Sequence, residues 1–196
     1  MIDNKSILIV GVGGQGTLIA SRILGSLAME LGYEVKLSEV HGMAQRGGSV
    51  VTHVKFGRRV FSPLIEVGKA DIILAFEKME ALRWIHYLKK DGTVIVNDQS
   101  IDPMPVITGL AQYPNDIWQR LNKWCSKVIS IDALSIAKEV GNIRVVNTVL
   151  LGVLAQKLGI PTTTWEKIIE NTVPPKTIEI NKQAFYKGYH SQKQDA

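Results

Sequence analysis

The chain is 196 residues long with 45% hydrophobic residues, 21% charged residues and a net charge of +5, a composition that excludes a disordered or collagen-like protein. No apolar run reaches the roughly 18 residues of a membrane-spanning helix, and the first residues lack the organisation of a secretion signal, so we expect a cytoplasmic protein without a membrane partner. The lysines and arginines stand in ones and twos, without the basic runs or interleaved aromatic residues of nucleic-acid-binding proteins, so we expect no nucleic-acid partner.

The first predicted elements form a strand, a turn and a helix. Residues 6–10 are a continuous apolar run and predict a buried strand, and residues 16–31 carry apolar side chains at helical spacing until Gly32 ends the pattern. Residues 33–40 predict a second strand, which a right-handed crossover would place beside the first in a parallel sheet. This unit is typical of nucleotide-binding α/β proteins.

The rest of the chain continues the alternation and then becomes helical. Residues 49–56 and 58–63 flank Gly57 and Arg58 and predict a β-hairpin. Further strands are predicted at 70–77, 93–98 and 127–133, a surface segment at 103–109, and helices at 78–90, 115–125, 134–140, 145–158, 162–171 and 176–187. We expect one α/β, Rossmann-like domain over residues 1–190, with a mostly parallel sheet, a β-hairpin insertion and a helical C-terminal third, followed by a frayed tail at 191–196.

The stretch GVGGQG directly follows the first strand. Gly11, Gly13 and Gly16 match the pattern G-x-G-x-x-G between a strand and a helix, where the backbone N–H groups of the helix N-terminus attract an anion. Glu39, near the end of the second strand, is the acidic residue that a NAD-type site would use, whereas Gln15 inside the loop is a departure from such sites. The motif alone leaves three alternatives open: a dinucleotide site, a site for another anion, or a structural turn.

A second loop, HGMAQRGGSV at residues 41–50, follows the second strand and is expected at the same sheet edge as the first. Its glycines can expose backbone N–H groups, and Arg46 carries a planar fork suited to carboxylate or phosphate. A surface role for Arg46 and a non-catalytic role for His41 remain open at this point. The candidate site comprises Gly11, Gly13, Gly14, Gln15, Gly16, His41, Gln45, Arg46, Gly47, Gly48 and Ser49.

Other polar and aromatic residues are given structural interpretations. Cys125, the single cysteine, is predicted to be a core thiol, and it can hold neither a disulfide within the chain nor an iron–sulfur cluster or cysteine-based zinc site. The helix at 115–125 is expected to bury Ile117, Leu121 and Trp124 on one face. Trp84 and Trp165 are interpreted as core residues, and Asp71, Glu77 and Asp98 as solvated charges at strand ends, with a role in the cleft left open for Glu77 or Asp98.

Four stretches together carry a family resemblance: ILIVGVGGQG, LSEVHGMAQRGGSVVTHVKFG, SPLIEVGKADIILAFEKMEALR and NTVLLGVLA. They resemble the gamma-type domain of the 2-oxoacid:ferredoxin oxidoreductases over about residues 5–155. The form His41-Gly42-Met43-Ala44-Gln45-Arg46-Gly47-Gly48, where the wider family more often begins with Tyr-Gly, resembles the small subunit of the indolepyruvate, or arylpyruvate, branch.

The resemblance implies an enzyme subunit that is inactive alone. The family decarboxylates 2-oxoacids oxidatively to acyl-CoA, with thiamine diphosphate and iron–sulfur clusters passing electrons to ferredoxin. This chain lacks both the G-D-G thiamine-binding pattern and cluster cysteines, so both cofactors are expected in a larger partner subunit, with ferredoxin reached through the complex. The glycine loops are then expected to border the substrate or coenzyme A channel. Two other functions stay open: a stand-alone NAD(P)-binding oxidoreductase and a purely structural assembly subunit.

Overall fold

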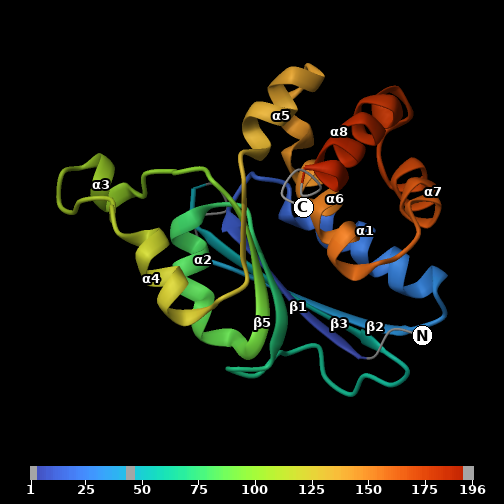
Figure 1. Cartoon of the computed structure of the whole chain (residues 1–196), viewed down its shortest axis with the longest axis horizontal. Coiled ribbons are helices and arrows are strands. Elements are labelled where there is room, and N and C mark those ends of the chain that lie inside the picture. Colours follow the sequence, from blue (N-terminus) through green and yellow to red (C-terminus); the bar gives the residue numbers. More distant parts are fainter. Residues whose placement is uncertain (1–3, 43–46, 192–196) are drawn as a thin grey trace.

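A computed structural model describes residues 4–42 and 47–191 of the chain. These residues form a six-stranded sheet with strand order β2-β3-β1-β4-β5-β6 (Figure 1). Strands β1, β4, β5 and β6 pair in parallel, whereas β3 is antiparallel to both of its neighbours, β1 and β2. The strands are β1 (Lys5–Val12), β2 (Glu34–His41), β3 (Ser49–Gly57), β4 (Ala70–Ala75), β5 (Leu88–Asn97) and β6 (Val128–Ile131).

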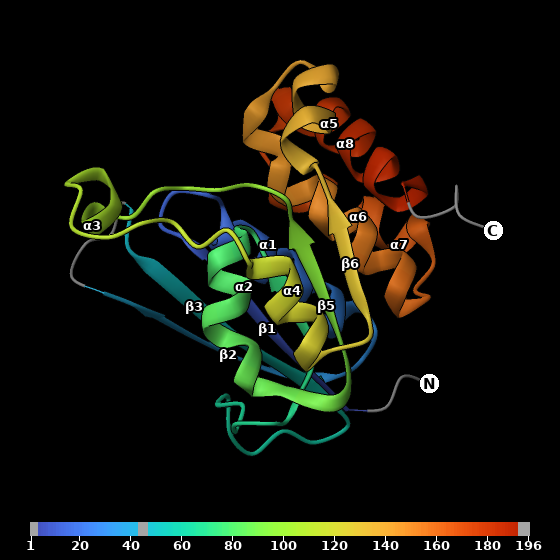
Figure 2. The same cartoon turned by 60° about the vertical axis from the view of Figure 1, so that its left-hand side comes forward.

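Helices cover both faces of this sheet, as Figures 1 and 2 show. On one face lie α2 (Lys78–Trp84) and α4 (Ile117–Trp124), and on the other lie α1 (Thr17–Glu30), α6 (Val146–Leu158), α7 (Thr162–Thr172) and α8 (Ile178–His190). The remaining helical segments are α3 (Met104–Ile107), α5 (Ala133–Val140) and the 3-10 turns η1 (Ile85–Tyr87), η2 (Ile143–Val145) and η3 (Pro175–Thr177).

The alternation of side chains along β1 divides the core in two. Ile7 and Ile9 belong to the cluster shared with α1, α6, α7 and α8, while Leu8 and Val10 belong to the cluster shared with α2 and α4. All four side chains are fully buried. This central strand is apolar on both faces because successive residues point to opposite sides of the sheet, and both sides are covered by helices.

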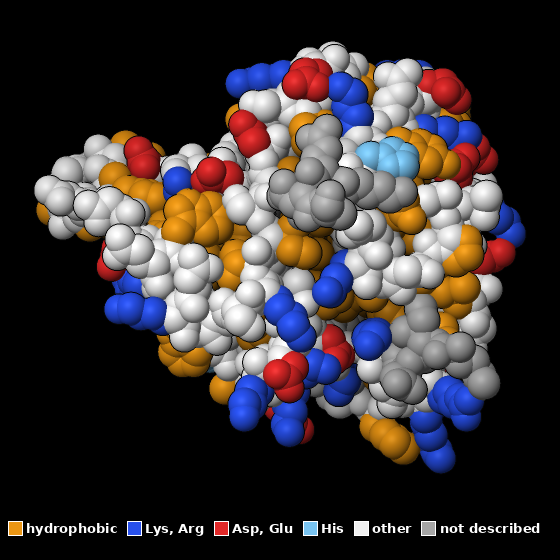
Figure 3. Space-filling view, in the orientation of Figure 1, with side chains coloured by type: hydrophobic (Ala, Val, Ile, Leu, Met, Phe, Trp, Pro, Cys, Tyr) orange, Lys and Arg blue, Asp and Glu red, His pale blue; other side chains and the backbone are white. Residues whose placement is uncertain are grey.

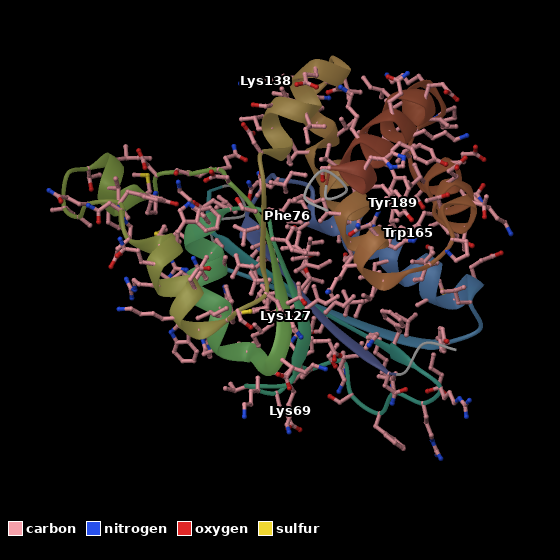
Figure 4. The ribbon with its side chains drawn as sticks, in the orientation of Figure 1. Lys69, Phe76, Lys127, Lys138, Trp165 and Tyr189 are labelled. Carbon is pink, nitrogen blue, oxygen red and sulfur yellow. The ribbon has the colours of Figure 1, made fainter. Side chains whose placement is uncertain are left out.

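The larger helical layer is packed so tightly that glycines are required between α6 and α8. A Cβ atom at Gly152 would lie 2.1 Å from the carbonyl oxygen of Phe185, and one at Gly188 would lie 2.0 Å from that of Val149. Figure 4 shows Trp165 and Tyr189 within this same layer, on the far side of the molecule from α3, which Figure 1 labels. Trp165 is fully buried.

The predicted α/β class, the mostly parallel sheet and the helical C-terminal third are confirmed. The prediction that residues 33–40 pair directly with the first strand is wrong, because β3 lies between β2 and β1. The hairpin was predicted around Gly57 and Arg58, but β3 forms its hairpin with the preceding strand β2, and residues 58–63 form no strand. The insertion therefore precedes its predicted position by one strand.

Several finer predictions are also corrected. The helix expected over residues 78–90 ends earlier, because β5 already begins at Leu88. Ile117 and Leu121 are buried as expected, but Trp124, the last residue of α4, is 64% exposed. Cys125 is buried, as predicted, with its thiol 3.4 Å from the carbonyl oxygen of Gly92. In the part of the chain that is described, no helix has the length and apolar character needed to cross a membrane. Of the predicted frayed tail, all but Ser191 lies outside the described residues.

Candidate functional site

The two glycine loops meet at the carboxyl ends of the parallel strands. The backbone N–H of Gly13 donates to the carbonyl oxygen of Gly48 at 2.8 Å, and the N–H of Gly47 donates to that of Gly13 at 3.3 Å. β2 runs in the same direction as β1, since both are antiparallel to β3, and for this reason both loops emerge at one edge. The expected juxtaposition of the loops is therefore found, despite the inserted strand.

Three glycines of the first loop are needed for its shape. Gly14 and Gly16 have φ angles of 102° and 86°, in the left-handed region that favours glycine. Gly11 lies in a crowded position, where a Cβ atom would be 2.9 Å from both Gln15 Oε1 and Phe76 Cβ. Figure 4 places Phe76 near the carboxyl end of the sheet, with Lys127 and Lys69 toward the amino end. Gly11 therefore leaves room at the end of β1 for the side chains of Gln15 and Phe76.

Gln15 ties the first loop to the adjacent strands. Its Oε1 accepts a hydrogen bond from the backbone N–H of Val12 at 2.8 Å. Its Nε2 donates to the carbonyl oxygen of Phe76 at 3.0 Å and to Gln99 Oε1 at 3.3 Å. These bonds link the ends of β1, β4 and β5, so Gln15 has a structural role in addition to lining the adjacent pocket.

Helix α1 begins at this loop with an unfilled N-terminus. Gly16 is its N-cap residue, the first turn carries no acidic side chain, and the backbone N–H groups of Thr17 and Leu18 have no protein acceptor among the described residues. A helix N-terminus concentrates partial positive charge and free donors. The first loop therefore presents a place where an anionic group is stabilised.

A pocket of about 400 Å³ opens beside this N-terminus. Asn147 in α6 lines it and is only 3% exposed. Its Oδ1 accepts a long hydrogen bond of 3.4 Å from Thr148, while its Nδ2 has no acceptor in the described part of the chain and lies against Gly16. Arg144, also in the lining, forms no ion pair with a described carboxylate. Two donors on α6 and η2 thus face the same space as the α1 N-terminus.

Two further pockets adjoin the first. One of about 310 Å³ shares Ile19, Arg144 and Asn147 with it and continues toward Lys176. The other, of about 460 Å³, lies on the side of the glycine loop where β2 ends and is lined in part by His41. The three hollows follow one another around the start of α1, which suits a long, partly anionic ligand better than a compact one.

The structure separates the predicted site residues into groups. The first loop and the two described glycines of the second loop come together, and His41, although exposed at the end of β2, lines the adjoining 460 Å³ pocket with the first loop. The hydroxyl of Ser49 is engaged with residues outside the pockets. It donates to the buried Glu80, and Trp84 Nε1 donates to Ser49 Oγ at 3.4 Å. Gln45 and Arg46 lie outside the described residues.

Sequence reasoning missed Asn147, Arg144 and Gln99, and it misjudged Glu77. Asn147 opens the stretch NTVLLGVLA that carries part of the family resemblance but was not assigned to the site, and Gln99 belongs to no motif; both reach the site through the tertiary fold. Glu77 is fully buried, not solvated, and accepts hydrogen bonds from the backbone N–H groups of Glu80 at 2.9 Å and Ile101 at 3.2 Å, and from the hydroxyl of Tyr113.

Burial, together with the hydrogen bond to Glu77 and its negative charge, raises the pKa of Tyr113 above that of an ordinary tyrosine. The phenol therefore stays protonated and available as a donor to this carboxylate.

Glu39, the acid of the NAD-type alternative, is displaced from the first glycine loop by one inserted strand. Glu39 is located on β2, and β3 lies between β2 and the strand that carries the first glycine loop. Each strand adds about 4.8 Å across a sheet, so Glu39 is one strand further from the loop than a residue on a directly adjacent strand. Its carboxylate accepts a hydrogen bond of 3.3 Å from Thr52. Glu39 nevertheless lines the pocket of about 460 Å³ together with Gly13, Gly14 and Gly16, so the fold by itself leaves the NAD-type alternative open.

A family model described as pyruvate ferredoxin/flavodoxin oxidoreductase matches residues 6–191, and the chain belongs to this family. It is accordingly a small subunit of a 2-oxoacid:ferredoxin oxidoreductase. The chain is 45% identical to the indolepyruvate oxidoreductase subunit IorB of Thermococcus kodakarensis, over 96% of each protein.

Solved structures agree on the fold. The pyruvate oxidoreductase subunit PORC of Thermotoga maritima superposes with a TM-score of 0.72 at 23% identity, covering 96% of this chain and 97% of that one. A 2-oxoglutarate:ferredoxin oxidoreductase of Magnetococcus marinus, solved with 2-oxoglutarate, coenzyme A and succinyl-CoA, matches with a TM-score of 0.74 at 19% identity. The match covers all of this chain but 32% of that one, so there the same fold is part of a longer polypeptide.

Proposed function

We propose that this chain is the small subunit of an indolepyruvate-type enzyme that oxidatively decarboxylates an arylpyruvate to its acyl-CoA and passes the electrons to ferredoxin. The relatives named as indolepyruvate oxidoreductase subunits support the substrate class. The thiamine diphosphate and iron–sulfur clusters belong to a larger partner subunit. One cysteine in the chain is too few for a cluster, and the described residues contain no group of three or more metal-ligating side chains.

The pairing of the two glycine loops around the start of α1 carries the second half of the proposal. There the subunit binds an anionic part of coenzyme A or of the oxoacid: the free N–H groups of α1 and Asn147 Nδ2 donate to it, and Arg144 supplies positive charge. Coenzyme A carries a pyrophosphate and a 3′-phosphate at one end of an extended molecule. The row of adjoining pockets, with Arg144 and Lys176 along it, matches such a shape and charge.

In the assembled enzyme these groups bind and orient the ligand, and they perform no redox step. Thiamine diphosphate supplies the carbanion chemistry of decarboxylation when it is bound in the partner. The small subunit places the carboxyl edge of its sheet, with both glycine loops, against the space where the acyl group is transferred.

The direct test is purification of the tagged chain together with its partner. We expect a larger subunit that contains thiamine diphosphate and iron to co-purify, and turnover of indolepyruvate to require both chains. Failure of the wild-type chain to associate with such a subunit would contradict the proposal. Saturable binding of NADH to the isolated chain at micromolar concentrations, followed by fluorescence, would instead support a nicotinamide enzyme.

A second test uses single arginine variants in the assembled complex. Arg144→Ala is expected to raise the KM for coenzyme A or for the oxoacid about tenfold, equivalent to about 1.4 kcal/mol, and whichever KM rises identifies the ligand at this position. Arg46→Ala tests the second loop in the same way. Arg22→Ala is the matched control, because Arg22 is exposed on α1 and lines none of the three pockets. Unchanged kinetics in both test variants would dispose of the assignment.

A further inference from the structure

A separate arm projects from the body of the protein between β5 and α4. It comprises residues 99–115 and carries α3 near its tip; Figures 1 and 2 show it standing away from the sheet and both helical layers. In the space-filling view it forms a lobe of its own at the left of the molecule (Figure 3). Three large apolar side chains lie exposed on it: Met104 at 66%, Ile107 at 65% and Leu110 at 84%.

The arm has a defined fold despite making so little contact with the core. Pro103 begins a helical turn, Gly109 takes a φ of 76°, and the N–H groups of Leu110 and Ala111 both donate to the carbonyl oxygen of Pro105, at 2.8 Å and 3.0 Å. The turn therefore closes on itself with its own backbone hydrogen bonds. Its apolar side chains are held outward in the absence of any protein surface that covers them among the described residues.

Both ends of the arm are fixed to one buried carboxylate. Glu77 accepts a hydrogen bond from the N–H of Ile101 at the start of the arm and from the hydroxyl of Tyr113 near its end. Lys78 adds an ion pair with Asp98 at 3.5 Å and lies 6.0 Å from the centre of the Tyr113 ring. A fully buried carboxylate is costly unless it is well satisfied, and here its partners are the two roots of the arm. The direction of the arm is thus set before any partner binds.

Charge and position indicate what covers the tip. Asp102 is the single charged residue of the arm, in a chain that is 21% charged. A partner surface for it is therefore apolar, which is the composition of the core of a stable interface. The first residue of the arm, Gln99, also lines the 400 Å³ pocket and bonds to Gln15, so the arm begins at the candidate site itself. A partner that brings chemistry to this edge of the sheet meets the arm.

We propose that residues 99–115 are the docking arm by which this chain binds the larger subunit of its oxidoreductase, with Met104, Ile107 and Leu110 inserted into an apolar groove of that subunit. The proposal rests on the proposed function, since it takes the larger subunit as the partner. In the Magnetococcus enzyme the same fold is part of a longer chain, so there too it occurs beside further protein of the same enzyme. A second copy of this chain is the competing occupant, and dimerisation through the arm is one of the outcomes that overturn the proposal.

The test measures subunit association with the double variant Ile107→Glu/Leu110→Glu in the full chain. Both side chains are exposed, so the isolated variant is expected to keep the circular dichroism spectrum and Tm of the wild type. The Kd for the larger subunit is expected to rise at least tenfold. Phe61→Glu is the matched control: Phe61 is 79% exposed and apolar, lies in the loop between β3 and β4 at the other end of the sheet, and should leave the Kd unchanged.

The outcomes separate this inference from the proposed function. If wild type and double variant bind the larger subunit equally well, the arm proposal is overturned while the proposed function stands. If the wild-type chain binds no such subunit, both are overturned. If light scattering finds the isolated wild-type chain as a dimer and the double variant as a monomer, the occupant is a second copy and the arm proposal is likewise overturned. Loss of association in the double variant alone supports it.

Discussion

The α6–α8 contact and the carboxyl edge of the sheet differ in how closely their groups are packed and how fully they are paired within the chain. Between α6 and α8 the backbones approach so closely that Gly152 and Gly188 have no room for a Cβ atom. At the carboxyl edge, the first N–H groups of α1 and the amide nitrogen of Asn147 have no acceptor among the described residues, and the arm exposes apolar side chains. The α6–α8 contact therefore leaves no room for a further group, whereas the carboxyl edge offers groups that a ligand or a partner subunit can bind.

The largest effect on stability is expected at the closely packed contact between α6 and α8. Gly152→Ala forces a methyl group against the carbonyl oxygen of Phe185, which cannot move without shifting α8. We expect the free energy of unfolding to fall by about 3 kcal/mol or more and the Tm by roughly 10 °C, measured by thermal denaturation. Gly42→Ala is the control, because no atom of the described residues beyond its chain neighbours lies within 4 Å of the added methyl group. Equal Tm values for the two variants would contradict the tight packing of α6 on α8.

The next effect separates the buried root of the arm from an exposed charge nearby. Glu77→Ala removes the acceptor of three hydrogen bonds and leaves the Tyr113 hydroxyl without it, so we expect a loss of about 2 kcal/mol in stability by chemical denaturation. Asp98→Ala removes an ion pair whose carboxylate is 44% exposed, and we expect at most about 0.5 kcal/mol. A reversed order would mean that Glu77 does not hold the arm.

A third effect is expected in ligand binding at the open edge. Asn147→Asp keeps the size of the side chain but places a negative charge beside the start of α1, where it repels an incoming anion. We expect the KM of the affected substrate to rise about tenfold in the assembled enzyme, with the complex intact by size-exclusion chromatography. Asn122→Asp, at an exposed position of α4, is the control. No change of KM on charging Asn147 would show that no anion binds there.

The smallest effect is the change of stability with pH that we expect from the buried side chain of His53. Burial lowers the pKa of His53 below the ordinary value of 6.5, and its Nδ1 accepts a hydrogen bond of 3.1 Å from the N–H of Ile65. The neutral form is therefore favoured in the folded state. Its contribution to stability is present above pH 6.5 and is lost as the pH falls from there through the lowered pKa.

The measurement is the stability of wild type and His53→Gln between pH 7.5 and about pH 5. The glutamine can still accept the hydrogen bond but does not titrate, so its stability curve should be flatter over this interval. Parallel curves for the two proteins would mean that His53 takes up its proton without opposition from the fold.

The sequence predicted those features that depend on neighbouring residues. The first glycine loop was recognisable because strand, turn and helix follow one another directly, and the burial of Cys125 because of its apolar neighbours. The pairing of β3 between β1 and β2 was missed, since the local pattern of a strand does not state its partner, and a crossover from the first strand to the second was the more common arrangement.

The site was predictable only in its backbone half. The glycines of both loops carry a pattern, but Asn147 and Arg144 lie about a hundred residues or more later in the chain, and although Asn147 begins the stretch NTVLLGVLA, nothing local places either side chain beside the glycine loops. Glu77 looked like a solvated charge at a strand end because nothing local reveals that the chain returns over it with Tyr113. Arg46 remains a prediction, as it lies outside the described residues.

The short helix α2 and its N-cap contact three segments that are far apart in the sequence: the two ends of the arm and the start of β3. Glu77 at its start holds the two roots of the arm, and Glu80, one turn later, accepts a hydrogen bond from Ser49 at the beginning of β3, next to the second glycine loop. One short helix therefore carries both the contacts that position the arm and the contact that holds the start of β3 beside the second loop.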